Sequence, residues 1–372
     1  MVPGILCFSY GLQQAQLSWE LFYYSILGLL AISASLALFS TNSYYLTHTF
    51  RIFLGLVFIY SGFVKAVDPP GSQYKFIDYF EAWNIMFAEP AALPLSILLS
   101  LSEFIIGIAL FFNLLTRYAS LGALIFMIGF TPITLYLALQ EQSTGKELVH
   151  DCGCFGDALI LTNWQTFWKN IVLLIPAIWV FIRRNRFISN FNQTAQSIII
   201  AGFALMSLII SYIGIEHLPI IDFRPYKIGT NIPKSMEIPE GAPQPEYKTL
   251  LYYKNTVSGE IKEFSLENYP NDTVWQFADV KNILVKEGYA PPIQNFSITS
   301  KEEGDITDMI LQDTNYNFLL IAYDLQKSSV KKQKEINELY QWAKSKQYNF
   351  RCVTSSIDEI ISTFKKQHNA QY

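Results

Sequence analysis

The chain has little charge for its length. Of its 372 residues only 16% are charged, whereas 51% are hydrophobic and 15% are aromatic. Soluble proteins carry about 25% charged residues, so this composition excludes an ordinary soluble chain. The shortage is also uneven, because only 20 of the 58 Asp, Glu, Lys and Arg residues precede Asp222. The sequence therefore predicts a membrane part, a boundary near residues 217–224, and a soluble part after it.

Basic runs, histidine and cysteine are scarce as well. The net charge is −4 and no basic run is suited to phosphate, which argues against a nucleic-acid partner. Four histidines make a complete metal shell hard to assemble. Four cysteines do not make a disulfide framework, so we expect them to serve function rather than scaffolding.

Long apolar runs, by contrast, are plentiful. About 20 apolar residues span a bilayer, and six stretches qualify: residues 21–40, 50–67, 91–112, 118–140, 163–182 and 196–215. We predict an all-α bundle of about six helices in the lipid bilayer, with a kink at Pro132. Arg51 and Lys65 lie near the ends of one span, where long side chains reach the interface. Residues 1–48 form an N-terminal segment with one helix, and residues 49–216 form the main membrane domain.

Basic residues in short loops predict the orientation. The cluster "RRNR" at residues 183–186 should be cytoplasmic. Alternation then places residues 141–161 and everything after residue 216 on the opposite face. We therefore expect a multi-pass protein of the cytoplasmic (inner) membrane, with these segments on the periplasmic side, where disulfides persist.

The soluble part begins with a linker rich in Pro and Gly at residues 217–246. Hairpins are expected within residues 249–265 and 296–311, followed by a buried strand at 317–325, a helix at 331–346, a strand at 349–356 and a helix at 357–367. This order predicts a small α/β domain over residues 247–372. Because the chain stops there, we expect the domain to be incomplete.

The stretch "HDCGCFGD" at residues 150–157 holds two of the four cysteines. Cys152 and Cys154 are close enough in sequence to form a small ring, and such a pair can exchange with other thiols. Gly153 tolerates the backbone angles that the ring needs, and Gly156 allows a second turn. A protonated His150 would favour a thiolate, and Asp151 would oppose it. We expect Phe155 to dip into the bilayer interface.

Other interpretations of these residues remain open. The two cysteines could form a static pair, bond to Cys7 or Cys352, or bind a soft metal ion together with His150. Glu103, in the middle of a predicted span, is a functional candidate because a carboxyl there is costly, and its alternative is a packing residue. Lys65 and Asp68 are better explained by interface contact and helix termination than by catalysis. Cys352 is expected to be a buried free thiol.

Three segments together resemble the DoxX/MauE-like family of small membrane proteins: "GLVFIYSGFVKAVDP" at residues 55–69, Glu103, and "DCGCFGD". The similarity covers residues 50–215 and implies a four-helix core. It also implies a redox role in the cell envelope, because MauE-type members are linked to maturation of disulfide-containing periplasmic proteins. DoxX/DoxD-type members are linked to quinone-linked sulfur oxidation, which makes a membrane quinone the candidate cofactor.

The soluble part resembles a thioredoxin-like domain of the peroxiredoxin/TlpA kind, on "FSITSKEEGDITDMIL" followed by "NFLLIAYDL". In that family the catalytic cysteines follow the first core strand. Here "DLQKSS" at residues 324–329 holds that place without a cysteine. The resemblance therefore implies a domain without thiol activity of its own.

Two hypotheses follow. The first is a membrane thiol–disulfide oxidoreductase that uses Cys152 and Cys154 on a periplasmic client or partner oxidoreductase. The second is a non-enzymatic anchor for other subunits of an envelope complex, with the thioredoxin-like domain as an adaptor.

Overall fold

The computed structural model describes residues 44–144, 148–149, 151–244, 246–266, 268–270, 274–286, 288–294, 296–326, 328 and 330–372. Contacts divide the chain into two compact units, Met1–Arg224 and Pro225–Tyr372. Each unit is considered by itself. The expected helix at residues 21–40, Cys7 and His150 lie outside the described residues.

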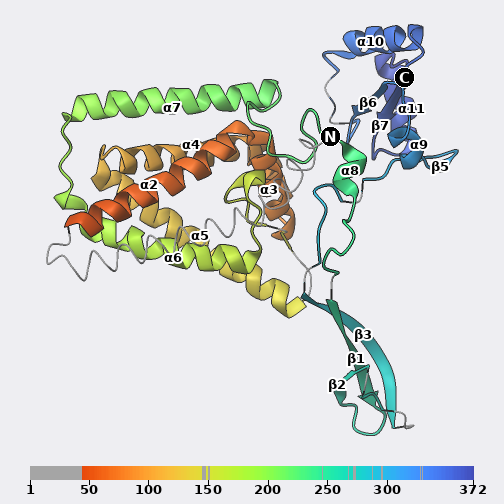
Figure 1. The fold of residues 1–372 in the computed structure, drawn as a ribbon, viewed down its shortest axis with the longest axis horizontal. Helices are drawn as coiled ribbons and strands as arrows, with labels where there is room; N and C mark the ends of the chain where they lie inside the picture. The colour runs from red at the N-terminus through yellow and green to blue at the C-terminus, as the bar shows by residue number, and fades with distance from the viewer. Residues whose placement is uncertain are drawn as a thin grey trace. The chain divides into compact units, whose positions relative to one another are not determined.

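In the membrane unit, five helices are long and apolar enough to cross a bilayer. They are α2 (Tyr44–Val67), α4 (Ala92–Phe111, preceded by the 3-10 turn Met86–Ala91), α5 (Thr116–Thr144), α6 (Asn163–Ile182) and α7 (Gln193–Glu216) (Figure 1). A shorter helix, α3 (Pro69–Ala82), lies between α2 and α4. The five spans expected from residue 50 onward are therefore confirmed, and α5 continues through Pro132 as one helix.

The helix ends follow local rules. Asp68 separates α2 from α3, and its carboxylate accepts a hydrogen bond from the Gly71 N–H at 3.2 Å. Two prolines then occupy the first turn of α3, where a missing N–H costs nothing. Thr162 and Gln165 form a capping box at the start of α6, where the sequence predicts a cap.

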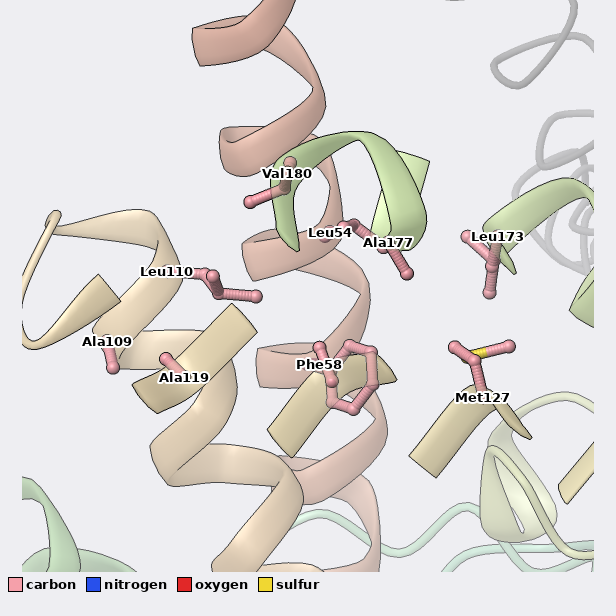
Figure 2. Packing of buried hydrophobic residues seen from close by; sticks show 10 residues of the cluster. Leu54, Phe58, Ala109, Leu110, Ala119, Met127, Leu173, Ala177 and Val180 are labelled. Carbon is pink, nitrogen blue, oxygen red and sulfur yellow. The ribbon is translucent and has the colours of Figure 1, made fainter. Parts of the chain in front are cut away.

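The apolar core of this unit is built from α2, α4, α5 and α6. Figure 2 shows side chains from all four helices meeting: Leu54, Phe58, Ala109, Leu110, Ala119, Met127, Leu173, Ala177 and Val180. Glycines bring α2 and α4 into backbone contact, because a Cβ at Gly62 would clash with the backbone of Phe104. A Cβ at Gly55 would lie 2.7 Å from the Phe111 nitrogen. This close approach sets the residues of α2 directly beside those of α4.

Arg51 does not reach the interface, contrary to the expectation. It is buried, and its guanidinium donates to the carbonyl of Leu110 and, at 2.8 Å, to that of Phe111. Those carbonyls lie at the end of α4, where the helix leaves its last C=O groups without internal partners. The carbonyl groups at the end of α4 therefore keep the Arg51 guanidinium inside the protein.

The C-terminal unit contains a three-stranded antiparallel sheet in the order β2-β1-β3. Its strands are β1 (Glu246–Asn255), β2 (Ile261–Ser265) and β3 (Trp275–Lys286). The expected β1–β2 hairpin is confirmed, with Gly259 in its turn at φ +75°. Strand β3 was not expected and pairs with β1 along ten residues of β1.

The rest of this unit confirms the predicted β-α-β-α order. After α8 (Ile232–Met236) and the sheet come β4 (Thr299–Ser300), β5 (Gly304–Asp305), α9 (Thr307–Leu311), β6 (Asn317–Ile321), α10 (Gln333–Ser345), β7 (Asn349–Val353) and α11 (Asp358–His368). Strands β6 and β7 are parallel. β6 is shorter than the strand expected at residues 317–325, and it is not buried, since Ile321 is 76% exposed. A two-stranded sheet leaves such a strand partly uncovered.

Candidate functional site

Cys152 and Cys154 form a disulfide, with Cα atoms 5.5 Å apart. Gly153 between them has φ +64°, in the left-handed region that favours glycine. A Cβ there would also lie 3.0 Å from Cγ of Lys75. Cys352 in β7 is a free thiol, so it is not the partner of either cysteine, and it is half-buried rather than buried as expected.

One side of the disulfide loop contacts α3 through an ion pair. Lys75 Nζ lies 2.6 Å from Asp151 Oδ2, and the Gly153 N–H donates to Asp151 Oδ1 at 2.7 Å. The charge of Asp151 is therefore balanced by Lys75 and absorbed by the loop backbone. The same carboxylate acts on Tyr79, whose pKa is raised first by burial and then by the nearby charges of Asp151 and Asp78.

The other side of the loop lies against a buried ion pair between α2 and α4. Lys65 Nζ is 2.7 Å from Glu103 Oε2, 2.9 Å from Ser61 Oγ and 2.5 Å from the carbonyl oxygen of Cys154. An ammonium has three donors, so all of them are used. The Ser61 hydroxyl lies 2.7 Å from Glu103 Oε2 and 2.6 Å from the Cys154 carbonyl. The disulfide loop is thus tied to α2 and α4 through Cys154.

This geometry corrects two expectations. Lys65 does not extend to the interface, because Glu103 of α4 and the Cys154 carbonyl offer it partners inside the bundle; its side chain is 3% exposed. Phe155 does not dip into the bilayer interface either. It is 2% exposed and lies against Tyr60, with ring centroids 5.6 Å apart. Asp68 contacts the α3 backbone and caps that helix.

Lys169 is a site residue that sequence reasoning missed. It lies in the second turn of α6, is buried, and its Nζ sits 4.6 Å from the centroid of the Phe155 ring. Its signal was available, because it is the only charged residue among positions 163–182. An ionisable residue inside a span is a functional candidate by default.

One pocket brings these groups together. Its lining includes the disulfide, Lys65, Glu103 and Lys169, together with apolar side chains from α2, α4 and α5: Val57, Phe58, Leu99, Phe126, Met127 and Phe130. A reactive sulfur pair therefore shares a largely apolar space with two ammonium groups and one carboxylate. Such a space can stabilise negative charge that forms on sulfur.

Five apolar helices packed around buried charges define a multi-pass membrane protein. Residues 43–183 match the family described as methylamine utilisation protein MauE, which confirms the resemblance predicted for the membrane part. Residues 247–287, which cover β2, β3 and all of β1 except Glu246, match a domain of unknown function, DUF8463.

A curated relative, Protein TlpB of Flavobacterium psychrophilum, is 25% identical over 170 residues. The match covers 45% of this chain and 44% of TlpB, so the chain spans less than half the length of that relative. No solved structure matches the chain significantly. The thioredoxin-like resemblance of the C-terminal unit stays a prediction.

Proposed function

We propose that this protein carries out thiol–disulfide exchange through Cys152 and Cys154 on the periplasmic face of the cytoplasmic membrane. One observation carries the proposal: the disulfide lines a pocket that also holds buried ionisable groups. Strongly perturbed environments of this kind cluster at functional sites. The similarity of residues 43–183 to the MauE family supports a redox-associated membrane role.

The step needs only sulfur chemistry. A client thiolate attacks one sulfur of the Cys152–Cys154 bond, which breaks as a mixed disulfide forms. The second client thiolate then attacks the mixed disulfide, and the client leaves with its own disulfide. Two electrons pass from the client sulfurs to Cys152 and Cys154. The two protons of the client thiols go to the new thiols or to solvent.

The orientation rests on the distribution of charge. Arg183, Arg184 and Arg186 follow the end of α6, whereas the disulfide loop precedes its start. Basic residues mark the cytoplasmic side, so the loop lies on the opposite, periplasmic side. Arg51 and Arg117, near the starts of α2 and α5, fall on the same side as this cluster. The C-terminal unit follows α7 and is periplasmic too.

A membrane quinone is the cofactor that the DoxX-type resemblance implies. The pocket fits such a group, because Leu99, Phe126 and Phe130 offer apolar walls and Lys169 offers a donor for a carbonyl oxygen. When bound, a quinone would supply a two-electron acceptor for the reduced cysteines. Without a cysteine at residues 324–329, the C-terminal unit docks a client rather than reacting with it.

The non-enzymatic anchor is the second candidate. The exposed Ile321, at the end of β6, and Tyr323, just after it, favour this function, because they offer apolar surface to a partner subunit. In that case the disulfide is structural and the membrane unit only holds the adaptor in place.

Single variants separate the two functions. The full-length protein in membrane vesicles is mixed with a reduced dithiol peptide, and peptide oxidation in a single turnover is followed by thiol alkylation and mass spectrometry. Cys152→Ser and Cys154→Ser should each abolish oxidation, because a single remaining thiol cannot accept the two electrons that the closed disulfide accepts. When the peptide is supplied instead in its disulfide form, the variant that keeps the nucleophilic thiolate should attack it and trap a mixed disulfide, with release of one peptide thiol. Cys352→Ser is the matched control and should oxidise the peptide normally. Equal oxidation by all three variants would leave the anchor as the function.

A further inference from the structure

Among the described residues, one lysine of the pocket beside the disulfide has no carboxylate partner. Lys65 and Glu103 neutralise each other at 2.7 Å. Lys169 is 5% exposed, and within the part of the chain that the structure describes its ammonium makes no hydrogen bond or ion pair. Its contact is the face of the Phe155 ring, which attracts a cation but does not cancel its charge.

The charged groups that line the pocket with Lys169 lie on two neighbouring helices. α2 contributes Lys65 and α4 contributes Glu103. The α5 residues that line the pocket, Phe126, Met127 and Phe130, carry no charge. Asp151 of the loop is paired with Lys75 at 2.6 Å. Among the described residues, the pocket therefore has a net charge of one positive unit when Lys169 is protonated and the disulfide is closed.

Reduction of the disulfide changes the net charge of the pocket. A disulfide is neutral, whereas a reduced pair with one thiolate carries one negative charge. An isolated cation in a low-dielectric site is costly, and a nearby anion relieves that cost. The same Coulomb term makes the thiolate easier to form and the reduced pair more stable.

We propose that Lys169 is a positioning residue whose ammonium is the counter-charge of the thiolate formed when the Cys152–Cys154 disulfide is reduced. This inference rests on the proposed exchange function and gives a physical reason for its direction. A stabilised reduced form makes the disulfide an oxidant, so the pair takes two electrons from client dithiols. Phe155, which follows Cys154 in the chain, holds Lys169 at the site while the disulfide is closed.

The experiment measures the redox equilibrium of the pair in the full-length protein. Purified protein in detergent is equilibrated with mixtures of reduced and oxidised glutathione, and the fraction of alkylated Cys152 and Cys154 is read by mass spectrometry. Lys169→Met should lower the equilibrium constant for reduction at least tenfold, which corresponds to about 30 mV for a two-electron couple. Lys169→Arg keeps the charge and should stay within about threefold of the wild type by the same scale.

Two further variants test whether the shift in the redox equilibrium comes from the charge of Lys169 or from a general disturbance of the fold. Glu103→Gln removes the negative charge and should shift the equilibrium in the opposite direction, toward the reduced pair. Thr166→Val is the matched control, because Thr166 is a buried, uncharged residue one turn earlier on α6, and its equilibrium should be unchanged. The pH at which the alkylation rate of the reduced pair reaches half its maximum should rise in Lys169→Met and fall in Glu103→Gln.

The outcomes distinguish this inference from the proposed function. A wild-type pair that exchanges with glutathione, together with an unchanged equilibrium and pH profile in Lys169→Met and Glu103→Gln, overturns the role of Lys169 but leaves the exchange function standing. A wild-type pair that does not exchange with glutathione at all overturns both.

Discussion

Charged side chains are few in the membrane unit and numerous in the C-terminal unit, and the two units place them differently. The side chains of Lys65 and Glu103 are 3% and 9% exposed, whereas those of Lys301 and Asp358 are 77% and 67% exposed. Water screens the second pair, and such surface pairs contribute little to stability. Burial therefore separates the charges that we propose to act in exchange from the charges at the surface, and their number does not.

The largest effect on stability is expected from a variant that removes one member of the buried ion pair and leaves the other without a partner. Lys65→Met leaves the Glu103 carboxylate without its ammonium partner inside the bundle. Removing one member of a buried pair typically costs about 3–5 kcal/mol, so we expect a loss of this size in the free energy of unfolding in detergent.

The control for this prediction is Lys301→Met, which should leave the unfolding midpoint of the C-terminal unit unchanged. Adding Glu103→Gln to Lys65→Met should restore part of the lost stability, because the uncompensated charge is then gone. Equal effects of Lys65→Met and Lys301→Met would show that burial does not distinguish the two pairs.

A smaller effect is expected from the glycines that bring the buried pair together. Gly62→Ala adds a methyl group against the backbone of Phe104, so α2 and α4 must move apart. Overpacking of this kind costs about 1–3 kcal/mol, and the separation should also slow peptide oxidation by weakening the contacts of Ser61 and Lys65.

Gly129→Ala in α5 is the matched control. A Cβ at Gly129 meets no described atom within 4 Å, and alanine favours the helix by about 1 kcal/mol. We therefore expect unfolding of Gly129→Ala to need equal or more denaturant. A destabilised Gly129→Ala protein would mean that the loss in Gly62→Ala does not report on the α2–α4 contact.

The smallest expected effect concerns the free thiol of the C-terminal unit. Burial raises the pKa of Cys352, an effect that Lys365 partly opposes. A raised pKa leaves less thiolate near pH 8, so alkylation of Cys352 should be slower than that of an unfolded cysteine peptide and should speed up in urea. After mild reduction, Cys152 and Cys154 should react faster than Cys352. The reverse order would mean that the disulfide loop does not favour thiolate.

Features of the fold that depend on residues close together in the sequence could be predicted. The five long helices between residues 44 and 216 follow from apolar length, the start of α6 follows from its cap, and the β1–β2 hairpin follows from alternation around a glycine turn. Strand β3 was missed, although it pairs with all ten residues of β1. Its own sequence is a weak strand signal, and strand formation depends strongly on the neighbouring strand.

The sequence by itself determined that apolar helices precede a charged α/β part, and that two cysteines share a loop at the end of a span. Only the tertiary structure decided which charges are buried together. Lys65 and Glu103 are 38 residues apart, and Lys169 belongs to another helix. Their meeting depends on how each helix is rotated and how closely the glycines let α2 and α4 approach. Local sequence sets where a helix begins and ends, but the face it turns to its neighbours follows from packing the whole bundle.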